Sequence, residues 1–235
     1  MYTLPKLLGG QYVLTSVRKD LPECVVFAAT QKDLRREVLV VSLKPACCTL
    51  EGKARFVAAA RAQSLCRHSF VSAPLELFEA DGAWHLARER WSGTPLDVLM
   101  ANGRLLSPMQ CCVLLREICH LVITLDAMRL ASIRLEPDEV YLRGDGSFRF
   151  DNPAVCGSRT QAMREQALKA AGSWVLHLVD MSREYSKRTE SLALRMVQTQ
   201  ASSALTAVNF SEEVSILQYQ MGFTGAASSK IAPKT

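Results

Sequence analysis

Short apolar runs rich in β-branched and aromatic residues dominate the first third of the chain. Polar or proline-containing segments separate these runs, which is the pattern of antiparallel strands. The pattern predicts five strands, over residues 12–14, 24–29, 38–43, 75–79 and 84–89. Asp81-Gly82 lies between the last two, and Asp-Gly is a strong signal for a tight hairpin turn.

The period changes to that of a helix between the third and fourth predicted strands. Apolar and small residues recur at helical spacing over 53–66, with Phe56, Ala60 and Ser64 on one face. Helical patterns then prevail after Gly93. A short helix is predicted over 95–101, ending at Asn102-Gly103.

Ser107-Pro108 supplies an N-cap and a proline at the first helical position. The helix that follows carries a broad apolar stripe, so we expect it to be packed on most of its surface. A second hairpin is predicted over 140–142 and 148–150, and three further helices over 162–179, 191–206 and 211–219. Residues 225–235 are small, polar and basic, and we expect them to form a mobile tail. The overall order predicts an α+β protein.

The composition fits a folded chain with a sizeable core. The chain has 235 residues, of which 49% are hydrophobic, enough for one large domain or two lobes. The net charge of +5 is spread along the chain, without the basic cluster and interleaved aromatics of a nucleic-acid binder. The nearest candidate, Lys32 with Arg35 and Arg36, is interpreted as an ordinary solvated loop. We therefore expect no nucleic-acid partner.

The cysteines and the N-terminus favour a cytoplasmic protein. None of the eight cysteines forms a C-x-x-C pair, and several fall on apolar faces, as expected of reduced, buried thiols. The four histidines lack metal-ligand spacing, so no metal site is expected. The first residues lack the apolar run of a signal peptide, and no segment has about 18 consecutive apolar residues, so no membrane span is expected.

Residues 130–142 read LASIRLEPDEVYL, and this segment resembles the catalytic loop of protein kinases, H-R-D-L-x-x-x-N followed by a short strand. Leu135 and Pro137 fit that frame. The positions that carry chemistry in the family do not. The family's His, Arg, catalytic Asp, Lys and metal-binding Asn fall on Ser132, Ile133, Arg134, Glu136 and Glu139, respectively.

Other segments match the family's motifs in the family's order. Val41-Ser42-Leu43-Lys44 resembles V-A-I-K, whose lysine contacts the α- and β-phosphates in kinases. The helix glutamate that normally pairs with this lysine falls on Ala59. The three glycines of the family's phosphate-covering loop fall on Lys19, Leu21 and Cys24, whose side chains would crowd a phosphate.

The segment 86–96 is similar to the hinge between kinase lobes, with Glu89 and Gly93 at the family's usual positions. Asp151-Asn152-Pro153 stands where the family has the metal-binding D-F-G. Asp151 is the most plausible surviving ligand, although the pattern Asp-Asn-Pro favours a simple turn after a strand over a metal site. Asp151 with Glu136 and Glu139 also makes an acidic group that a cation could occupy.

The resemblance implies a two-lobed protein-kinase-like fold. It predicts an N-lobe over 1–90, with a five-stranded antiparallel sheet and one helix, and a mainly helical C-lobe over 91–222, followed by a tail over 223–235. Only 84 residues follow Asp151 (235 − 151), so the C-lobe is shortened, and no A-P-E motif is present. The pattern is more similar to bacterial serine/threonine kinases than to eukaryotic ones.

The lost catalytic positions imply a pseudokinase. Arginine does not deprotonate in proteins, so Arg134 cannot replace the catalytic base. We expect a catalytically inactive scaffold or regulatory subunit that binds a protein partner, without a cofactor. An apolar patch or oligomer contact is expected among the last three helices. The alternatives are a nucleotide-binding switch or atypical phosphotransferase using Lys44 and Asp151, in which ATP would bind, and an unrelated α+β domain.

Overall fold

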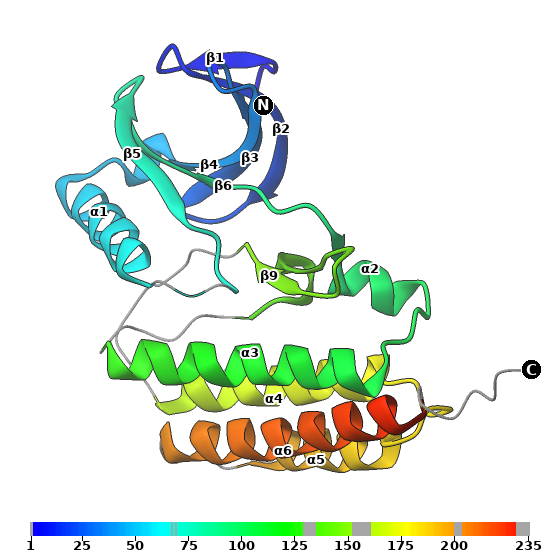
Figure 1. The fold of residues 1–235 in the computed structure, drawn as a ribbon. Coiled ribbons are helices and arrows are strands. Elements are labelled where there is room, and N and C mark those ends of the chain that lie inside the picture. Colours follow the sequence, from blue (N-terminus) through cyan, green and yellow to red (C-terminus); the bar gives the residue numbers. More distant parts are fainter. Residues whose placement is uncertain are drawn as a thin grey trace, which may run out of the picture. The chain divides into compact units, whose positions relative to one another are not determined.

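The computed structural model describes residues 2–66, 68, 70–128, 135–151, 161–199 and 204–228. These residues fall into two compact units. The first contains the described residues up to Trp91, and the second contains those from Ser92 on. Figure 1 labels the elements of both units, which mix strands and helices. The predicted α+β class is confirmed.

The first unit is built on an antiparallel sheet of six strands. Its order is β1-β2-β3-β4-β6-β5. The strands are β1 (Lys6–Leu8), β2 (Tyr12–Asp20), β3 (Cys24–Gln31), β4 (Arg36–Leu43), β5 (Pro74–Ala80) and β6 (Ala83–Glu89). The prediction of five strands is wrong by one, because β1 has only three residues and no alternating pattern to signal it. Gly9 and Gly10, both with positive φ, turn the chain from β1 into β2.

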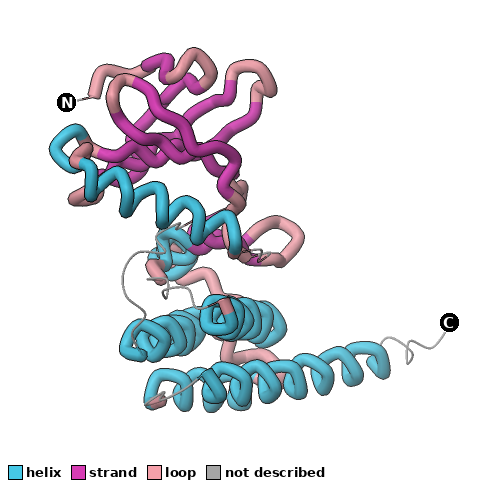
Figure 2. The backbone as a smooth tube through the Cα atoms, turned by 90° about the vertical axis from the view of Figure 1, so that its left-hand side faces the viewer, coloured by secondary structure: helices cyan, strands magenta, loops and turns pink. Residues whose placement is uncertain are grey.

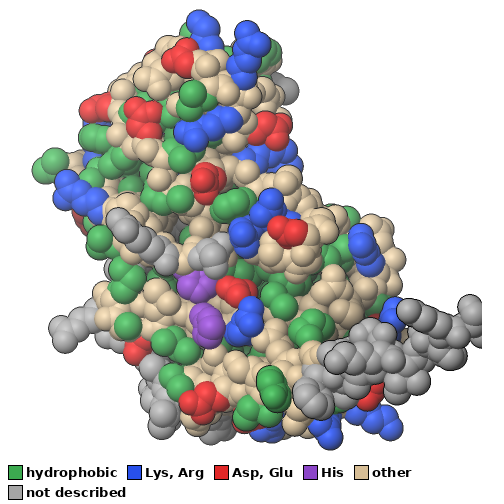
Figure 3. Space-filling view, in the orientation of Figure 1, with side chains coloured by type: hydrophobic (Ala, Val, Ile, Leu, Met, Phe, Trp, Pro, Cys, Tyr) green, Lys and Arg blue, Asp and Glu red, His purple; other side chains and the backbone are tan. Residues whose placement is uncertain are grey.

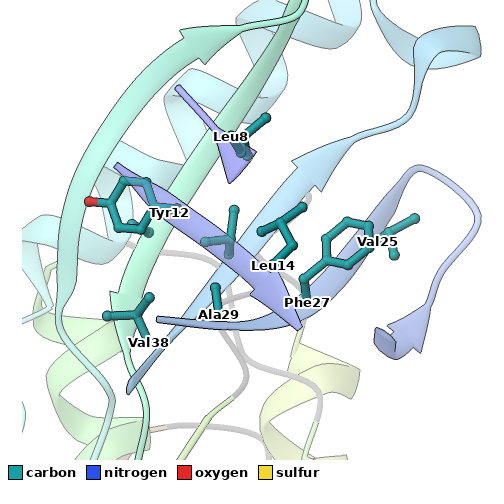
Figure 4. Close-up of a cluster of buried hydrophobic side chains, with 9 residues drawn as sticks. Leu8, Tyr12, Leu14, Val25, Phe27, Ala29 and Val38 are labelled. Carbon is teal, nitrogen blue, oxygen red and sulfur yellow. The ribbon is translucent and has the colours of Figure 1, made fainter. Parts of the chain in front are cut away.

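The sheet curls strongly, and its outer strands meet through side chains. The Tyr12 hydroxyl of β2 donates a 2.6 Å hydrogen bond to Glu76 Oε2 of β5, and the Tyr12 ring stacks on Phe78 at 5.1 Å. Lys6 of β1 forms a 2.7 Å ion pair with Asp81, in the turn after β5. Because the sheet curls, alternate residues of its strands point into a core enclosed on its inner face. Figure 4 shows this core, which consists of Leu8, Tyr12, Leu14, Val25, Phe27, Ala29, Val38, Val40 and Ala87.

Helix α1 (Leu50–Leu65) covers the opposite face of the sheet, as the tube view also shows (Figure 2). The intervening residues of the strands, among them Val26, Leu39 and Leu86, pack with Ala60 of the helix. Thr49 caps the helix, because its side chain accepts a hydrogen bond from the backbone N–H of Gly52 at 3.1 Å. A short 3₁₀ turn, Pro45–Cys47, links β4 to this helix.

The second unit begins with a small three-stranded sheet. Its strands are β7 (Thr94–Pro95), β8 (Val140–Leu142) and β9 (Phe148–Phe150), and β8 pairs with both neighbours. The predicted hairpin over 140–150 is therefore confirmed. The helices are α2 (Leu96–Ala101), α3 (Pro108–Ala127), α4 (Gln161–Leu178), α5 (Ser186–Gln198) and α6 (Ala204–Ser228), and α3 to α6 run side by side (Figure 1).

Helix α3 is the core helix of this unit. Ser107 and Gln110 form a capping box at its start, and ten of its residues are buried. Burial raises the pKa of three of its thiols, to about 12 at Cys111, about 11 at Cys112 and about 12 at Cys119. In the described part of the chain, α3 is also the one helix long and apolar enough to cross a membrane. However, 56% of its most apolar window is buried inside the protein, as in core helices of soluble proteins.

The last two helices depart from their predicted bounds. Helix α5 starts at Ser186, five residues before the predicted start at Ser191, because its first buried positions are the polar residues Ser186 and Thr189. Helix α6 spans 25 residues, whereas the prediction gave it nine, over 211–219, starting at a serine that is in fact buried inside the helix. It runs through Ser228 and so includes the first residues of the expected tail. The remaining tail lies outside the described residues.

Gly172 sets the approach of α4 to α5. A Cβ placed on Gly172 would lie 2.6 Å from the backbone oxygen of Ala193 and 3.0 Å from a Val197 methyl group. We expect Gly172→Ala to destabilise the protein by roughly 1–3 kcal/mol, because a backbone oxygen cannot rotate away from the added methyl. Gly222 is the matched control, since it is also helical but has open space around it, and Gly222→Ala should be neutral or stabilising. Urea unfolding of both variants measures the difference, and equal stabilities would contradict this account.

His85 makes the first unit sensitive to acid. Its ring is 5% exposed and stacks on Phe78. Nε2 lies 3.0 Å from the Ala80 oxygen, and Nδ1 lies 2.8 Å from the Ser42 hydroxyl. The carbonyl only accepts, so Nε2 carries the proton and Nδ1 accepts from Ser42. Burial lowers the pKa of His85, which therefore stays neutral in the folded protein at a pH where it is protonated in the unfolded chain.

Unfolded chains therefore bind more protons below about pH 6.5, the ordinary histidine pKa, and stability should fall as the pH drops from there toward the lower pKa of folded His85. Urea unfolding between about pH 5 and 7.5 tests this dependence. His85→Gln should flatten the profile over this window, and His120→Gln, at an exposed histidine, should leave it unchanged. An identical profile for His85→Gln and the parent protein would refute the role of His85.

Candidate functional site

Lys44 lies directly after β4, at the start of the 3₁₀ turn of the first unit. Its backbone is extended, and its N–H donates a 2.9 Å hydrogen bond to the carbonyl oxygen of Glu23. This bond ties the end of β4 to the turn between β2 and β3. The position of Lys44 is thus fixed by the register of three neighbouring strands.

The Lys44 ammonium is held by Asp20, the last residue of β2. Nζ lies 2.6 Å from Asp20 Oδ1, and the two side chains are 27% and 55% exposed. The hydrogen bond to Asp20 raises the pKa of Lys44, so the side chain stays charged. One of the three N–H donors of the ammonium is therefore directed at a carboxylate of the same sheet.

The turn between β2 and β3 is tight and acidic. Leu21 follows β2 directly, and its N–H donates a 2.9 Å hydrogen bond to the carbonyl oxygen of Cys24, where β3 begins. Three residues therefore connect the strands. The turn carries Asp20 and Glu23, and both carboxylates are already engaged, by Lys44 and by Arg55 at 3.3 Å. Such a turn offers a phosphate two negative charges instead of open backbone N–H groups.

Helix α1 has no carboxylate at the position to which the resemblance to kinases assigns the family's glutamate. Ala59 occupies that position and is half-buried. The helix uses its own charged residues elsewhere: Lys53 pairs with Glu79 at 3.2 Å, and Arg55 pairs with Glu51 at 3.0 Å. Lys53 and Arg55 are therefore both paired with carboxylates of the protein itself.

In the second unit, the structure brings Glu139 and Asp151 together at one end of the β8–β9 hairpin. The Asp151 N–H donates a 2.8 Å hydrogen bond to the Glu139 carbonyl oxygen, which continues the strand pairing by one step. Glu136 lies at the start of the 3₁₀ turn Pro137–Glu139, and its carbonyl oxygen accepts a 3.1 Å hydrogen bond from the Glu139 N–H. Asp151 is 6% exposed, so its carboxyl group is removed from solvent.

The described residues contain no group of three or more His, Cys, Asp or Glu side chains placed to hold a metal ion. Glu136, Glu139 and Asp151 therefore do not form the acidic cation site that their sequence positions allowed. Ser132, Ile133, Arg134, Asn152 and Pro153, at the remaining degenerate positions, lie outside the described residues. Lys44 and Asp151 belong to different units.

Gly93, at the start of the second unit, occupies a position that only glycine fits. Its φ is +149°, and a Cβ there would lie 2.6 Å from the Leu142 carbonyl oxygen and 3.3 Å from Tyr141 Cβ. The close approach allows Thr94 and Pro95 to pair with β8. Glycine at this position of the hinge-like segment thus has a local structural reason.

A scan against models of protein families matches none of them, and a search of curated proteins finds no sequence that matches the chain.

Sequence reasoning proposed Lys44 as a site residue and placed Ala59 at the expected glutamate position, but it missed the pairing of Lys44 with Asp20. The signal was present in the cluster Asp20-Leu21-Pro22-Glu23, which is a turn with a carboxylate at each end. Strand register then decides which basic residue each carboxylate meets. Cys24 pairs with Leu43 across β3 and β4, and this places Lys44 beside the turn.

The Lys44–Asp20 pair can be tested by the reactivity of the lysine amine. Only the neutral amine reacts with acylating reagents, and Asp20 raises the pKa of Lys44. We expect Asp20→Asn to lower that pKa and to increase acylation of Lys44 at about pH 8.5, as measured by mass spectrometry of digested protein. Lys53, paired with Glu79, serves as the internal control and should keep its reactivity. Unchanged labelling of Lys44 would contradict the pairing.

Proposed function

We propose that this protein is a pseudokinase: a protein-kinase-like chain that has lost phosphotransfer and acts as a protein-binding or regulatory component. The observation that carries the proposal is the state of Lys44. The ammonium at the position that kinases use for phosphate contact pairs at 2.6 Å with Asp20, a carboxylate of its own sheet. In active kinases the corresponding lysine pairs with a glutamate of the helix, a position that here falls on Ala59, so the pairing that active kinases require is replaced by a different one.

The order of elements supports the kinase-like part of the proposal. In the first unit, β2, β3 and β4 precede α1, and β5 and β6 follow it. This is the order of strands and helix in a kinase small lobe, with β1 as an addition at the sheet edge. The second unit begins with a glycine-dependent segment and continues with helices and the β8–β9 hairpin. Asp151 follows that hairpin, as the metal-binding aspartate does in kinases.

Electrostatics support the second part of the proposal, that the protein does not catalyse phosphotransfer. Phosphoryl transfer needs cations and backbone donors that stabilise the negative charge on the phosphates. Here the β2–β3 turn carries Asp20 and Glu23, and the loop before β8 carries Glu136 and Glu139. Four carboxylates at positions next to the family's phosphate and metal sites oppose polyphosphate binding.

The proposal places the protein in the cytoplasm. The seven described cysteines are free thiols, which fits a reducing compartment. A regulatory role would depend on protein surfaces, and the charged and apolar side chains on the outer helices of the second unit are the candidates.

Nucleotide titration tests the proposal. A ligand that binds only the folded state raises Tm, by an amount that grows with the ratio of its concentration to Kd. We expect no change in Tm with millimolar ATP and Mg²⁺ or Mn²⁺, and no phosphate transfer to general protein substrates or to the chain itself. Calorimetric titration under the same conditions should show no heat of binding.

Micromolar ATP binding that is lost in Lys44→Ala but kept in Lys53→Ala would overturn the proposal in favour of a nucleotide-binding switch. Lys53 is the matched control, because it is also an ion-paired lysine of the first unit. Metal-dependent transfer that is lost in Asp151→Asn would instead favour an atypical phosphotransferase.

A further inference from the structure

The outer face of α6 exposes apolar side chains that the fold leaves uncovered. The inner face packs through residues such as Phe210, Val214 and Leu217, and Arg116 of α3 donates a 2.9 Å hydrogen bond to Gln218. Ile216 and Tyr219 lie on the opposite face, 59% and 74% exposed. They are three residues apart on the helix and therefore neighbours on its surface. Together they form a small exposed apolar patch at the centre of this face.

Charged residues flank this apolar pair in a fixed order along the helix. Glu212 is exposed one turn before Ile216. One turn after Ile216, Gln220 accepts a 2.9 Å hydrogen bond from Arg188 of α5, so a guanidinium lies at that end. The space-filling view shows hydrophobic side chains between acidic and basic ones over α5 and α6 (Figure 3). The face therefore has a negative end, an apolar centre and a positive end.

We propose that this face, defined as Arg188, Glu212, Ile216, Tyr219 and Gln220, binds the same face of a second copy of the chain, with the two α6 helices antiparallel. A two-fold axis through Ile216 brings position 212 of one copy opposite position 220 of the other, because each is four residues from the centre. Glu212 then meets Arg188 at both ends of the contact, and Ile216 meets its own copy on the axis. A pattern with opposite charges equally spaced about an apolar centre is self-complementary under two-fold symmetry.

The same axis places Tyr219 opposite position 213 of the other copy. Glu213 is paired with Arg195 of α5, so a guanidinium is held next to that position. The partner's tyrosine ring can lie over this guanidinium, an arrangement in which an aromatic face attracts a cation. An antiparallel pair with this symmetry is closed, so it stops at two copies.

The contact is small, since it rests on one face of one helix and on the edge of its neighbour. Stable protein interfaces bury roughly 1,200–2,000 Å² in total, and this face offers less. The dimer is therefore reversible and forms with rising protein concentration. Dimerisation through this face does not depend on whether the protein binds nucleotide or transfers phosphate. A negative result in the nucleotide titration and a negative result in the association measurement are therefore distinguishable.

Sedimentation equilibrium over a series of protein concentrations up to about 500 µM tests the dimer, because that range covers dissociation constants of weak complexes. The wild-type chain should show a monomer–dimer equilibrium. Ile216→Asp should raise Kd by at least about tenfold, because it buries a charge on the axis. Leu194→Asp is the matched control, since Leu194 is an exposed apolar residue of α5 outside this face, and it should leave Kd unchanged.

A charge exchange identifies the orientation of the two copies. Glu212→Arg and Arg188→Glu should each weaken the dimer, and the double variant should restore Kd to within about threefold of wild type, because opposite charges face each other again. Circular dichroism and Tm of each variant establish that the monomer is folded. A wild-type chain that is monomeric throughout the concentration series, or a dimer that Ile216→Asp does not weaken, would overturn the proposal.

Discussion

The closure of the curled sheet is the constraint on which the first unit depends. Antiparallel strands twist, and a six-stranded sheet that curls far enough can enclose a core on its concave face. Here β2 reaches β5 through the Tyr12–Glu76 hydrogen bond and the stacking of Tyr12 on Phe78. The concave face is thereby filled with the protein's own side chains, and the convex face is left for α1. In β3, β4 and β6 the residues alternate between the two cores, which fixes the register of these strands.

That register decides which carboxylate Lys44 meets. Because β3 pairs with β4 from Cys24 to Gln31, the end of β4 lies beside the β2–β3 turn, and Lys44 meets Asp20. An exposed ion pair adds little to stability. Its consequence here is local, since it joins the end of β4 to the acidic turn between β2 and β3. The segment that resembles V-A-I-K thus forms the end of a strand in this sheet.

The second unit depends on close backbone approaches at two glycines. Gly93 lets the chain pass the Leu142 carbonyl oxygen, and Gly172 lets α4 pack on α5. With α3 buried among its neighbours, α6 covers the core with one face and exposes Ile216 and Tyr219 on the other. The helix that completes the core thus also carries an exposed apolar pair on its outer face.

The sequence alone determined the elements with strong local signals. Strands rich in β-branched residues, the Asp81-Gly82 turn and the Ser107-Pro108 start of α3 were predictable, because each depends on residues next to one another in the chain. The positions of the candidate site residues Lys44, Glu139 and Asp151 at strand ends also followed from such signals. The bounds of α5 and α6 did not, because buried serine and threonine interrupt the period of one helix and apolar residues surround the other.

Only the tertiary structure decided what those residues meet. The sixth strand, the Tyr12–Glu76 closure and the pairing of Lys44 with Asp20 join residues that are distant in the chain or belong to different strands. Local propensity carries no information on such pairs, since the curl and register of a sheet depend on how all its strands pack at once. The sequence therefore determined which residue types are available at the candidate site, and the fold determined that Lys44 pairs with Asp20.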